Sequence, residues 1–391
     1  MKQIINHILD DDLYKFTMQQ AVVKKFPRAK VKYAFINRGE TEFPEGFAEE
    51  LRKQVKMMET LALTKDQKSW MGKKCYYLDP TYLDFLYGYR FDSSEVGIIQ
   101  EGTSLKISID GYWHRTILWE VPLMALISEL FFMMTGEMFW DKEKRSKNNN
   151  DKKMLFRLNG IHFADFATRR RASFDIHDEF VEQMYSVHGN SNFVGTSNVY
   201  FAYKYNITPI GTHAHEWFMF HAAKYGYKMA NHLSMENWTD VYRGDLGIAL
   251  SDTFTTEVFF KSFDKKFAKL YDGVRHDSGD PIEFADKVIA HYEKLGIDPK
   301  SKAIVFSDSL NPEKAVKIKD HCRSKIKCSF GIGTNFSNDV GVKPLNMVIK
   351  MVEAKPEGED WHHTIKLSDS KGKYTGNVDE IVIAKHILNI K

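Results

Sequence analysis

Two histidines two residues apart lie near the middle of the chain, in the stretch GTHAHEW at 211–217. Apolar residues precede the stretch and an apolar helical pattern follows it, which predicts a strand end running into a helix. An imidazole can accept a proton, a metal ion or a phosphoryl group, and strand ends are where parallel sheets keep their chemistry. We therefore take His215 as the candidate centre of an active site; a hydrogen-bonded structural histidine is the alternative.

A turn at 275–281, RHDSGDP, brings an arginine, a histidine and two aspartates together. Helix capping explains Asp280, because a proline follows it and a glutamate stands three residues beyond it. Capping does not explain Arg275 and Asp277. A guanidinium beside a carboxylate suits an anionic substrate with a magnesium-borne ligand, or a structural ion pair. Asp252 and Asp308 follow apolar runs and could either cap helices or bind Mg²⁺.

A glycine-rich segment at 330–335, FGIGTN, predicts a loop whose backbone N–H groups and Thr334 hydroxyl surround a single phosphate. The third glycine of a dinucleotide fingerprint is missing, because Phe336 stands in its place. A tight turn at Gly331 and Gly333 is the alternative. Three arginines at 169–171 stand at a predicted helix start, where the helix dipole disfavours cations. We therefore expect a compensating anion beside them.

These residues need elements that bring them to one place. Seven short apolar runs alternate with stretches of helical spacing, which predicts strands in parallel pairing. The runs are 161–166, 193–195, 207–211, 247–250, 271–274, 303–306 and 326–330. Each run is followed by polar or glycine-rich residues, which in a parallel barrel converge on the face that carries the active site. We predict an irregular (β/α) barrel over 121–344.

The rest of the chain predicts an α+β domain over 1–120, joined by 345–391. A helix over 12–25, a strand over 30–37, a helix over 45–61 and a strand pair over 97–112 with its turn at 102–103 follow from hydrophobic spacing. The segment 141–153 combines six basic residues, three acidic ones and three consecutive asparagines, and is predicted to be a solvated loop.

The composition limits the classes of function. The 391 residues carry 55 basic and 52 acidic side chains, a net charge of +3, which favours no nucleic-acid partner. Three cysteines without a C-x-x-C pair indicate a reducing compartment, and the first residues offer no signal-peptide stretch, so we expect a cytoplasmic protein. The apolar tract 117–134 contains Glu120, Pro122 and Glu129, and is predicted to be a buried helix rather than a membrane span.

With these segments side by side, the chain resembles the nicotinate phosphoribosyltransferase family of type II phosphoribosyltransferases over nearly its whole length. The resemblance rests on nine segments in order: DLYK at 12–15 with MQQ at 18–20, LWEVPL at 118–123, DFATRRR at 165–171, FVGTSN at 193–198, GTHAHEW at 211–217, RHDSGDP at 275–281, VFSD at 305–308, SFGIGT at 329–334 and VKPLN at 342–346. His213 is the one departure, and it leaves His215 in the family's catalytic place.

The resemblance implies a reaction. Nicotinate, phosphoribosyl pyrophosphate, ATP and water give nicotinate mononucleotide, pyrophosphate, ADP and phosphate, a step of NAD biosynthesis and salvage in the ligase and glycosyltransferase class. The family's phosphohistidine maps onto His215, with Glu216 or a neighbouring aspartate orienting the ring. Mg²⁺ is the implied cofactor and ATP a co-substrate. The implied assembly is a homodimer with the active site at the subunit interface, with no membrane and no nucleic acid involved.

The resemblance also implies substrate contacts. Phe166 is expected to stack on the pyridine ring, with Tyr14 of a second subunit on its other face. Ser197 and Arg275 are expected to read anionic groups, the nicotinate carboxylate among them, with Arg169 near the phosphates. The remaining expected contacts are Thr196, Ser307, Asp308, Gly331, Gly333 and Thr334, of which the last three hold the ribose 5′-phosphate. Asp252, Asp277 and Asp308 are candidates for ribose hydroxyls or magnesium, Asp308 being the candidate metal ligand.

Three other interpretations remain open. A nicotinamide- or quinolinate-using phosphoribosyltransferase would share these motifs. A zinc-dependent amidohydrolase would use His213 and His215 as a metal pair on the first strand of its barrel. Only 176 residues follow His215, which are too few for a typical barrel of about 250 residues. A non-catalytic module that binds phosphorylated sugars would need the phosphate loop but not His215.

Overall fold

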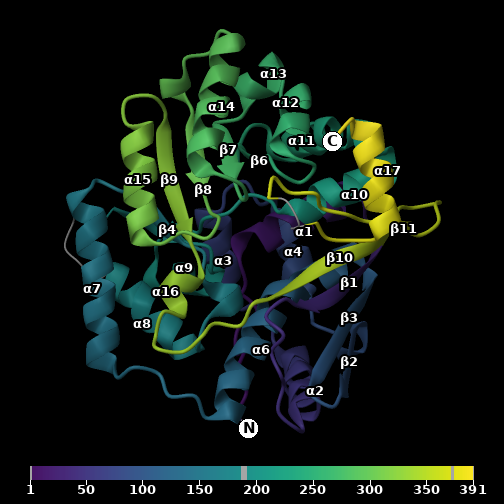
Figure 1. The fold of residues 1–391 in the computed structure, drawn as a ribbon. Coiled ribbons are helices and arrows are strands. Elements are labelled where there is room, and N and C mark those ends of the chain that lie inside the picture. The colour runs from purple at the N-terminus through teal and green to yellow at the C-terminus, as the bar shows by residue number, and fades with distance from the viewer. Residues whose placement is uncertain (1, 186–191, 371–373, 391) are drawn as a thin grey trace.

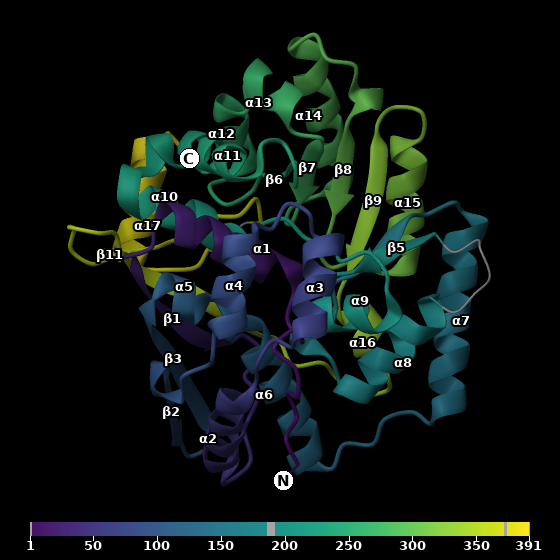
Figure 2. The same cartoon turned by 180° about the vertical axis from the view of Figure 1, so that it is seen from behind.

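The computed structural model describes residues 2–185, 192–370 and 374–390. Its strands form two sheets that occupy different parts of the molecule, as Figures 1 and 2 show from opposite sides. One is an antiparallel sheet in the order β11-β10-β1-β3-β2, and the other is a parallel sheet in the order β5-β4-β9-β8-β7-β6. The predicted fold class, an irregular α/β barrel with an α+β domain, is confirmed.

The antiparallel sheet takes its strands from both ends of the chain. These are β1 (Lys30–Asn37), β2 (Val96–Glu101), β3 (Ser104–Tyr112), β10 (Met347–Lys355) and β11 (His362–His363). Val31 and Tyr33 of β1 are buried, as period-two alternation predicts, and the predicted β2–β3 hairpin turns at Gly102, whose φ of 59° suits glycine. The domain limits at 120 and 345 stay a prediction, which the membership of β10 in this sheet supports.

The parallel sheet forms the floor of the site. Its strands are β4 (Phe163–Asp165), β5 (Phe193–Thr196), β6 (Ile248–Leu250), β7 (Gly273–His276), β8 (Ala303–Phe306) and β9 (Lys327–Ile332). Six of the seven predicted runs form these strands. The seventh, 207–211, makes only a single bridge from Pro209 to Thr196, because proline lacks the N–H that a ladder needs. Thr212, just after this run, donates from Oγ1 to the Ile248 carbonyl of β6 at 3.2 Å. The run therefore lies between the edge strands β5 and β6 and closes the barrel irregularly.

The helices of the first third of the chain pack on the antiparallel sheet or on other helices. They are α1 (Leu13–Lys25), α2 (Phe47–Met57), α3 (Lys65–Lys74), α4 (Pro80–Gly88), α5 (Trp113–Thr116) and α6 (Glu120–Thr135). The stretch Trp113–Thr135 is long and apolar enough to cross a membrane, but 78% of its apolar window is buried inside the fold. The predicted buried helix over 117–134 is therefore confirmed, as a core element that places Glu120 beside the site.

The predicted solvated loop at 141–153 is wrong, because this segment forms helix α7 (Lys142–Leu158). Asp141 caps it by accepting a hydrogen bond from the Lys144 N–H at 2.8 Å. The buried side chains Asn149, Lys152 and Phe156 recur at helical spacing. Two of the three are polar, so the stripe that anchors the helix does not show as a hydrophobic pattern.

The remaining helices mostly follow parallel strands. They are α8 (Phe174–Tyr185), α9 (Val199–Tyr205), α10 (His215–Tyr225), α11 (Tyr227–Tyr242), α12 (Thr256–Ser262), α13 (Lys265–Leu270), α14 (Pro281–Lys294), α15 (Pro312–Cys322), α16 (Thr334–Ser337) and α17 (Val378–Leu388). The predicted cap of α14 is confirmed, since the Asp280 carboxylate accepts from the N–H groups of Ile282 and Glu283, both at 2.9 Å. A cap of this kind contributes about 1 kcal/mol and fixes the turn just after Asp277.

Candidate active site

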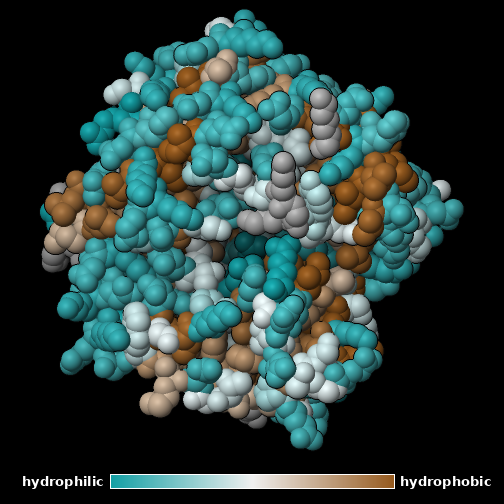
Figure 3. Space-filling view, viewed as in Figure 1, coloured by the Kyte–Doolittle hydropathy of each residue, from teal (hydrophilic) through white to brown (hydrophobic). Residues whose placement is uncertain are grey.

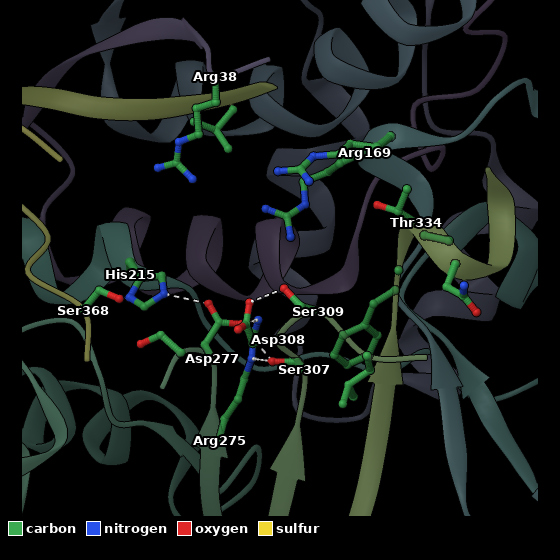
Figure 4. A pocket seen from close by; sticks show the side chains of 18 of the residues that line it. Arg38, Arg169, His215, Arg275, Asp277, Ser307, Asp308, Ser309, Thr334 and Ser368 are labelled. Carbon is green, nitrogen blue, oxygen red and sulfur yellow. Dashed lines mark hydrogen bonds and ion pairs between the residues drawn. The ribbon is translucent and has the colours of Figure 1, made fainter. Parts of the chain in front are cut away.

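A cavity of about 430 Å³ lies beyond the C-terminal ends of strands β4, β7, β8 and β9. Figure 3 shows a hollow with hydrophilic walls in the middle of this face. Of the residues that the structure describes, six cations and two carboxylates line the cavity: Arg38, Arg169, Arg170, Arg275, Lys350, Lys366, Asp277 and Asp308. In Figure 4, Arg38 and Arg169 face the strand ends from across the cavity. Such a cationic, concave wall attracts a polyanion.

Two smaller cavities adjoin the first. One of about 80 Å³ is mainly apolar and is lined by Phe166 and Tyr14 together with Ile210, Ile248 and Val305. The other, of about 50 Å³, lies between Tyr14 and His215. Arg169 and Arg275 line all three cavities, so they join an apolar pocket to a cationic one. Tyr14 and Phe166 of this chain line the apolar cavity together, and the stacking of a second subunit's Tyr14 stays a prediction.

His215 begins helix α10, and both of its ring nitrogens have partners. Nδ1 lies 3.0 Å from Thr253 Oγ1, and Nε2 lies 2.9 Å from Asp277 Oδ2 and 2.8 Å from Lys366 Nζ. Burial, followed by the Lys366 ammonium, lowers the pKa of His215 to about 4, although Asp252 and Asp277 oppose this shift. The imidazole is therefore neutral at pH 7, as a nucleophile must be.

Asp277 orients the imidazole, whereas Glu216 does not. The Asp277 carboxylate accepts from Arg275 Nη2 and from Ser307 Oγ, both at 2.8 Å, through the oxygen that does not face His215. Burial alone would raise the pKa of Asp277, but Arg275, His215 and Lys366 hold it well below its usual range. Glu216 turns away and accepts from the buried Lys15 at 3.1 Å. The alternative of a neighbouring aspartate is thus the one that the geometry supports.

Asp252 lies beneath the imidazole and does not line the cavities. Its Oδ2 accepts from Ser278 Oγ at 2.5 Å, and its Oδ1 is buried without a hydrogen-bond partner, 3.8 Å from His215 Nε2. Lys366 Nζ lies 3.3 Å from Asp252. The segment that carries Lys366 is fixed across the site by backbone hydrogen bonds from Leu367 to the Thr253 carbonyl at 2.8 Å and from Ser368 to the Asp252 carbonyl at 3.2 Å.

A metal ion fits some of these groups better than others. His215, Asp252 and Asp277 offer donor atoms within 4.8 Å of one another. Lys366 Nζ lies 2.8, 3.3 and 3.9 Å from their atoms, so an ammonium already supplies the cation there. Asp308 instead lines the large cavity, where an oxygen ligand suits a Mg²⁺ ion that arrives on phosphates.

The first part of the glycine-rich segment 330–335 belongs to strand β9, and its last three residues line the large cavity. Gly333 and Thr334 line the large cavity with Asn335, whose buried Oδ1 has no hydrogen-bond partner. Gly331 does not line it. A Cβ at Gly331 would lie 2.2 Å from the Phe166 ring, so this glycine makes room for the aromatic side chain rather than for a phosphate.

Ser197 and Thr196 end strand β5 with different roles. Ser197 lines the apolar cavity, and its hydroxyl donates to Asp12 Oδ1 at 2.7 Å. Thr196 is fully buried and donates to Asp165 Oδ2 at 2.6 Å, so it lines none of the three cavities and its expected substrate contact is replaced by a structural one. Arg169 and Arg275 both line the apolar cavity, where either guanidinium suits a carboxylate.

The three consecutive arginines separate. Arg169 and Arg170 line the large cavity, whereas Arg171 is fully buried and binds both oxygens of Asp10 at 2.7 and 2.8 Å. Asp10 is thus the compensating anion for one of the three. Burial and the neighbouring guanidinium groups of Arg169 and Arg38 lower the pKa of Arg170 to about 10. Like charges are therefore crowded on this wall, and a bound polyanion would relieve them.

Sequence reasoning missed Arg38, Lys350, Lys366 and Ser368, which line the large cavity. Arg38 directly follows β1, Lys350 lies in β10, and Lys366 and Ser368 follow β11, so none of them comes from the C-terminal ends of the parallel strands. An apolar-strand pattern interrupted by one lysine, as at 347–355, was the only local signal for Lys350.

The fold and the site define an enzyme of phosphorylated substrates, with a flat apolar pocket, a cationic cavity and a neutral histidine beside it. Family models match 9–128, as a nicotinate phosphoribosyltransferase N-terminal domain, and 161–390, as the nicotinate phosphoribosyltransferase family. The chain belongs to the nicotinate phosphoribosyltransferase family, and is an enzyme.

Individual relatives agree with this assignment. A nicotinate phosphoribosyltransferase of Chromohalobacter salexigens is 56% identical over 98% of both chains, and one of Methanosarcina acetivorans is 46% identical over 99% of both. Among solved structures, the nicotinate phosphoribosyltransferase of Porphyromonas gingivalis superposes with a TM-score of 0.96 at 45% identity, over 99% of this chain and 100% of that one. The Vibrio cholerae enzyme gives 0.91 at 33% identity over 99% and 95%.

The zinc-pair interpretation is not supported by the geometry. His213 is buried with its ring edge-on to Trp238, at a centroid distance of 4.8 Å, and also packs on Phe218. Among the described residues, the histidine of the metal-capable group is His215 alone. His213 is therefore a core residue.

Proposed function

We propose that this chain joins nicotinate to phosphoribosyl pyrophosphate at the three joined cavities, and couples the reaction to ATP hydrolysis through a phosphorylated His215. One observation carries the proposal. The apolar pocket between Phe166 and Tyr14 opens through Arg169 and Arg275 into the cationic cavity that His215 also lines. A flat aromatic acid and a polyphosphate sugar would therefore meet at these arginines. The product feeds NAD biosynthesis.

The glycosyl step needs positioning and charge rather than a general base. The pyridine nitrogen of nicotinate forms a bond to C1 of the sugar while the bond from C1 to the pyrophosphate oxygen breaks. Phe166 and Tyr14 hold the ring, and Arg275 pairs with its carboxylate. Arg169, Arg38 and Lys350 stabilise the negative charge that develops on pyrophosphate. Gly333 and Thr334 receive the 5′-phosphate.

The phosphoryl step places a neutral imidazole against the terminal phosphate of ATP. With its proton on Nε2, donated to the Asp277 carboxylate, the ring presents the Nδ1 lone pair beside Thr253 Oγ1. A bond forms from Nδ1 to phosphorus while the bond from phosphorus to the ADP oxygen breaks, and water later takes the phosphoryl group. Asp277 fixes the plane of the ring, and Lys366 neutralises charge on the incoming group.

Three further points belong to the proposal. Mg²⁺ bound through Asp308 supplies charge neutralisation on the substrate phosphates. A homodimer with the active site at the subunit interface stays a prediction. A cytoplasmic location stays a prediction as well.

Consumption of phosphoribosyl pyrophosphate by the purified protein, with nicotinate, nicotinamide or quinolinate as acceptor and with or without ATP, tests the proposed function. We expect turnover with nicotinate and stimulation by ATP. Turnover with nicotinamide or quinolinate in place of nicotinate would assign the chain to another substrate, and binding without turnover would favour a phosphosugar-binding module.

Lys350 predicts a pH dependence of substrate binding. Burial and Arg169 lower its pKa to about 8, although Glu120 opposes the shift, so the lysine is charged below pH 8 and loses its charge as the pH rises through that value. The KM for phosphoribosyl pyrophosphate is expected to rise by up to about tenfold between pH 7 and pH 9. Lys350→Met should give a raised KM that no longer changes over this range. Initial-rate measurements at fixed saturating nicotinate check this, and an equal slope in the variant would contradict it.

A further inference from the structure

Helix α7 reaches the phosphate loop, which we define as residues 333–341, through two side chains. Lys152 Nζ lies 2.5 Å from the carbonyl oxygen of Asn335 and 2.6 Å from Asp339 Oδ2. Asn148 Nδ2 donates to the carbonyl and carboxylate oxygens of Asp339, at 3.2 and 3.0 Å. The helix therefore contacts Asn335, next to Thr334, and Asp339, two residues beyond the end of the short helix α16.

The opposite side of the loop is held by the segment that carries Phe166 and Arg169. Ser337 Oγ donates to the Ala167 carbonyl at 2.8 Å, and Asn338 Nδ2 donates to the Arg170 carbonyl at 2.7 Å. The phosphate loop thus lies between the cavity wall at 166–170 and helix α7. Only the α7 side brings a cation to the loop backbone in these contacts.

Burying the Lys152 ammonium costs free energy, so its contacts with the loop must offset this cost. Its side chain is only 8% exposed, and burial lowers the pKa of this lysine although Asp339 opposes the shift. An ammonium in such a place is normally paired and hydrogen-bonded, because removing it from water costs several kcal/mol. Here it has both a carboxylate and a carbonyl partner. A loop ordered in advance loses less freedom when ligand arrives, which raises affinity.

Helix α7 has separate attachments that do not involve Lys152. Arg145 Nη2 lies 2.7 Å from Glu179 Oε2, and Lys153 Nζ donates to the Gln183 carbonyl at 2.6 Å, so both join α7 to α8. The helix is therefore expected to stay docked when Lys152 is replaced. This separation makes it possible to distinguish a positioning role from a purely structural one.

We propose that Lys152 is a positioning residue, which with Asn148 holds the phosphate loop in the conformation that receives the 5′-phosphate of the sugar substrate. The inference rests on the proposed function, since it takes phosphoribosyl pyrophosphate as the ligand of this loop. It assigns to the polar helix 142–158 a role in substrate affinity. Lys152 acts through Asn335 and Asp339 and does not line the cavity.

Lys152→Met in the full-length protein tests the inference, because methionine fills similar space without the charge. We expect the KM for phosphoribosyl pyrophosphate to rise about tenfold, with kcat and the KM for nicotinate changed by less than about twofold, as loss of a charged hydrogen bond predicts. Lys147→Met is the matched control, since Lys147 is exposed on the same helix, and it should leave all three constants unchanged. Lys152→Arg keeps a cation and should recover part of the lost affinity.

Two outcomes would overturn the inference. One is a wild-type value of the sugar KM in Lys152→Met, and the other is a uniform loss of kcat and both affinities with a lowered melting temperature, which a structural role predicts. If Lys152→Met does not fold, Asn148→Ala replaces it. That variant removes only the two bonds to Asp339, and it should raise the same KM by a smaller factor. Wild-type protein without nicotinate-dependent turnover would instead refute the proposed function.

Discussion

His215→Asn is expected to abolish labelling of the protein by ATP that carries a radioactive terminal phosphate. Asparagine occupies similar space and can still donate to Asp277, but its amide nitrogen has no lone pair to attack phosphorus. ATP-stimulated turnover should fall by roughly 10²–10³-fold, the scale on which loss of a nucleophile acts. Slow turnover without ATP should remain, because the glycosyl step uses other residues.

The measurement is acid-labile, base-stable radioactivity on the protein after incubation with ATP. His386→Asn is the matched control, since His386 is exposed on α17 away from the cavities, and this variant should label as wild type does. Undiminished labelling of His215→Asn would place the phosphoryl acceptor elsewhere. Equal loss of ATP-independent turnover would show instead that His215 also serves the glycosyl step.

The pH range of this labelling follows from the environment of the imidazole. The pKa of His215 is lowered to about 4, chiefly by burial, so protonation removes the nucleophile only as the pH falls through that value. A solvent-exposed histidine would already lose half of its neutral form near pH 6.5. Labelling should therefore remain close to maximal at pH 5.5. The nucleophile is kept neutral by the fold rather than by the solution.

Much of this site was predictable because its residues follow parallel strands directly. His215, Arg275, Asp277, Ser307 and Asp308 stand within a few residues of strands or of a strand-like run, and the convergence of such loops on one face is a property of the fold. The partner of each residue was not predictable. Glu216 is next to His215 in sequence, yet helix geometry turns it toward Lys15, and the ring meets Asp277 from another strand end.

The residues that were missed, or given another role, depend on contacts between distant segments. Threonine and glycine often bind phosphates, but neither Thr196 nor Gly331 is free to do so. The Thr196 hydroxyl donates to Asp165, and Gly331 makes room for the Phe166 ring. Lys366 arrives from a segment beyond the antiparallel sheet, 151 residues after His215. Nothing in its neighbourhood in the sequence marks it as part of the site. Tertiary packing alone selects among chemically suitable residues.

Lys366→Met is the second substitution for which we expect a large effect. Lys366 Nζ lies 2.8 Å from His215 Nε2 and near both Asp252 and Asp277, where it balances two carboxylates. Without the ammonium, the incoming phosphoryl group would face these carboxylates uncompensated. The rate of His215 labelling at pH 7 should fall by about a hundredfold, as loss of a charge that acts on the transferring group predicts. Lys325→Met is the control, since Lys325 is an exposed lysine in the turn that precedes strand β9.

The same substitution should change the pH profile in a definite direction. Lys366 lowers the pKa of His215, whereas Asp252 and Asp277 raise it, so removing the lysine leaves only the opposing influence of the carboxylates against burial. The acid limb of labelling should then move from about pH 4 toward pH 6.5, the ordinary pKa of histidine. Lys366→Arg keeps the charge and should keep the limb low. An unshifted limb in Lys366→Met, together with an undiminished rate, would mean that burial alone keeps the imidazole neutral and that the lysine has no part in phosphoryl transfer.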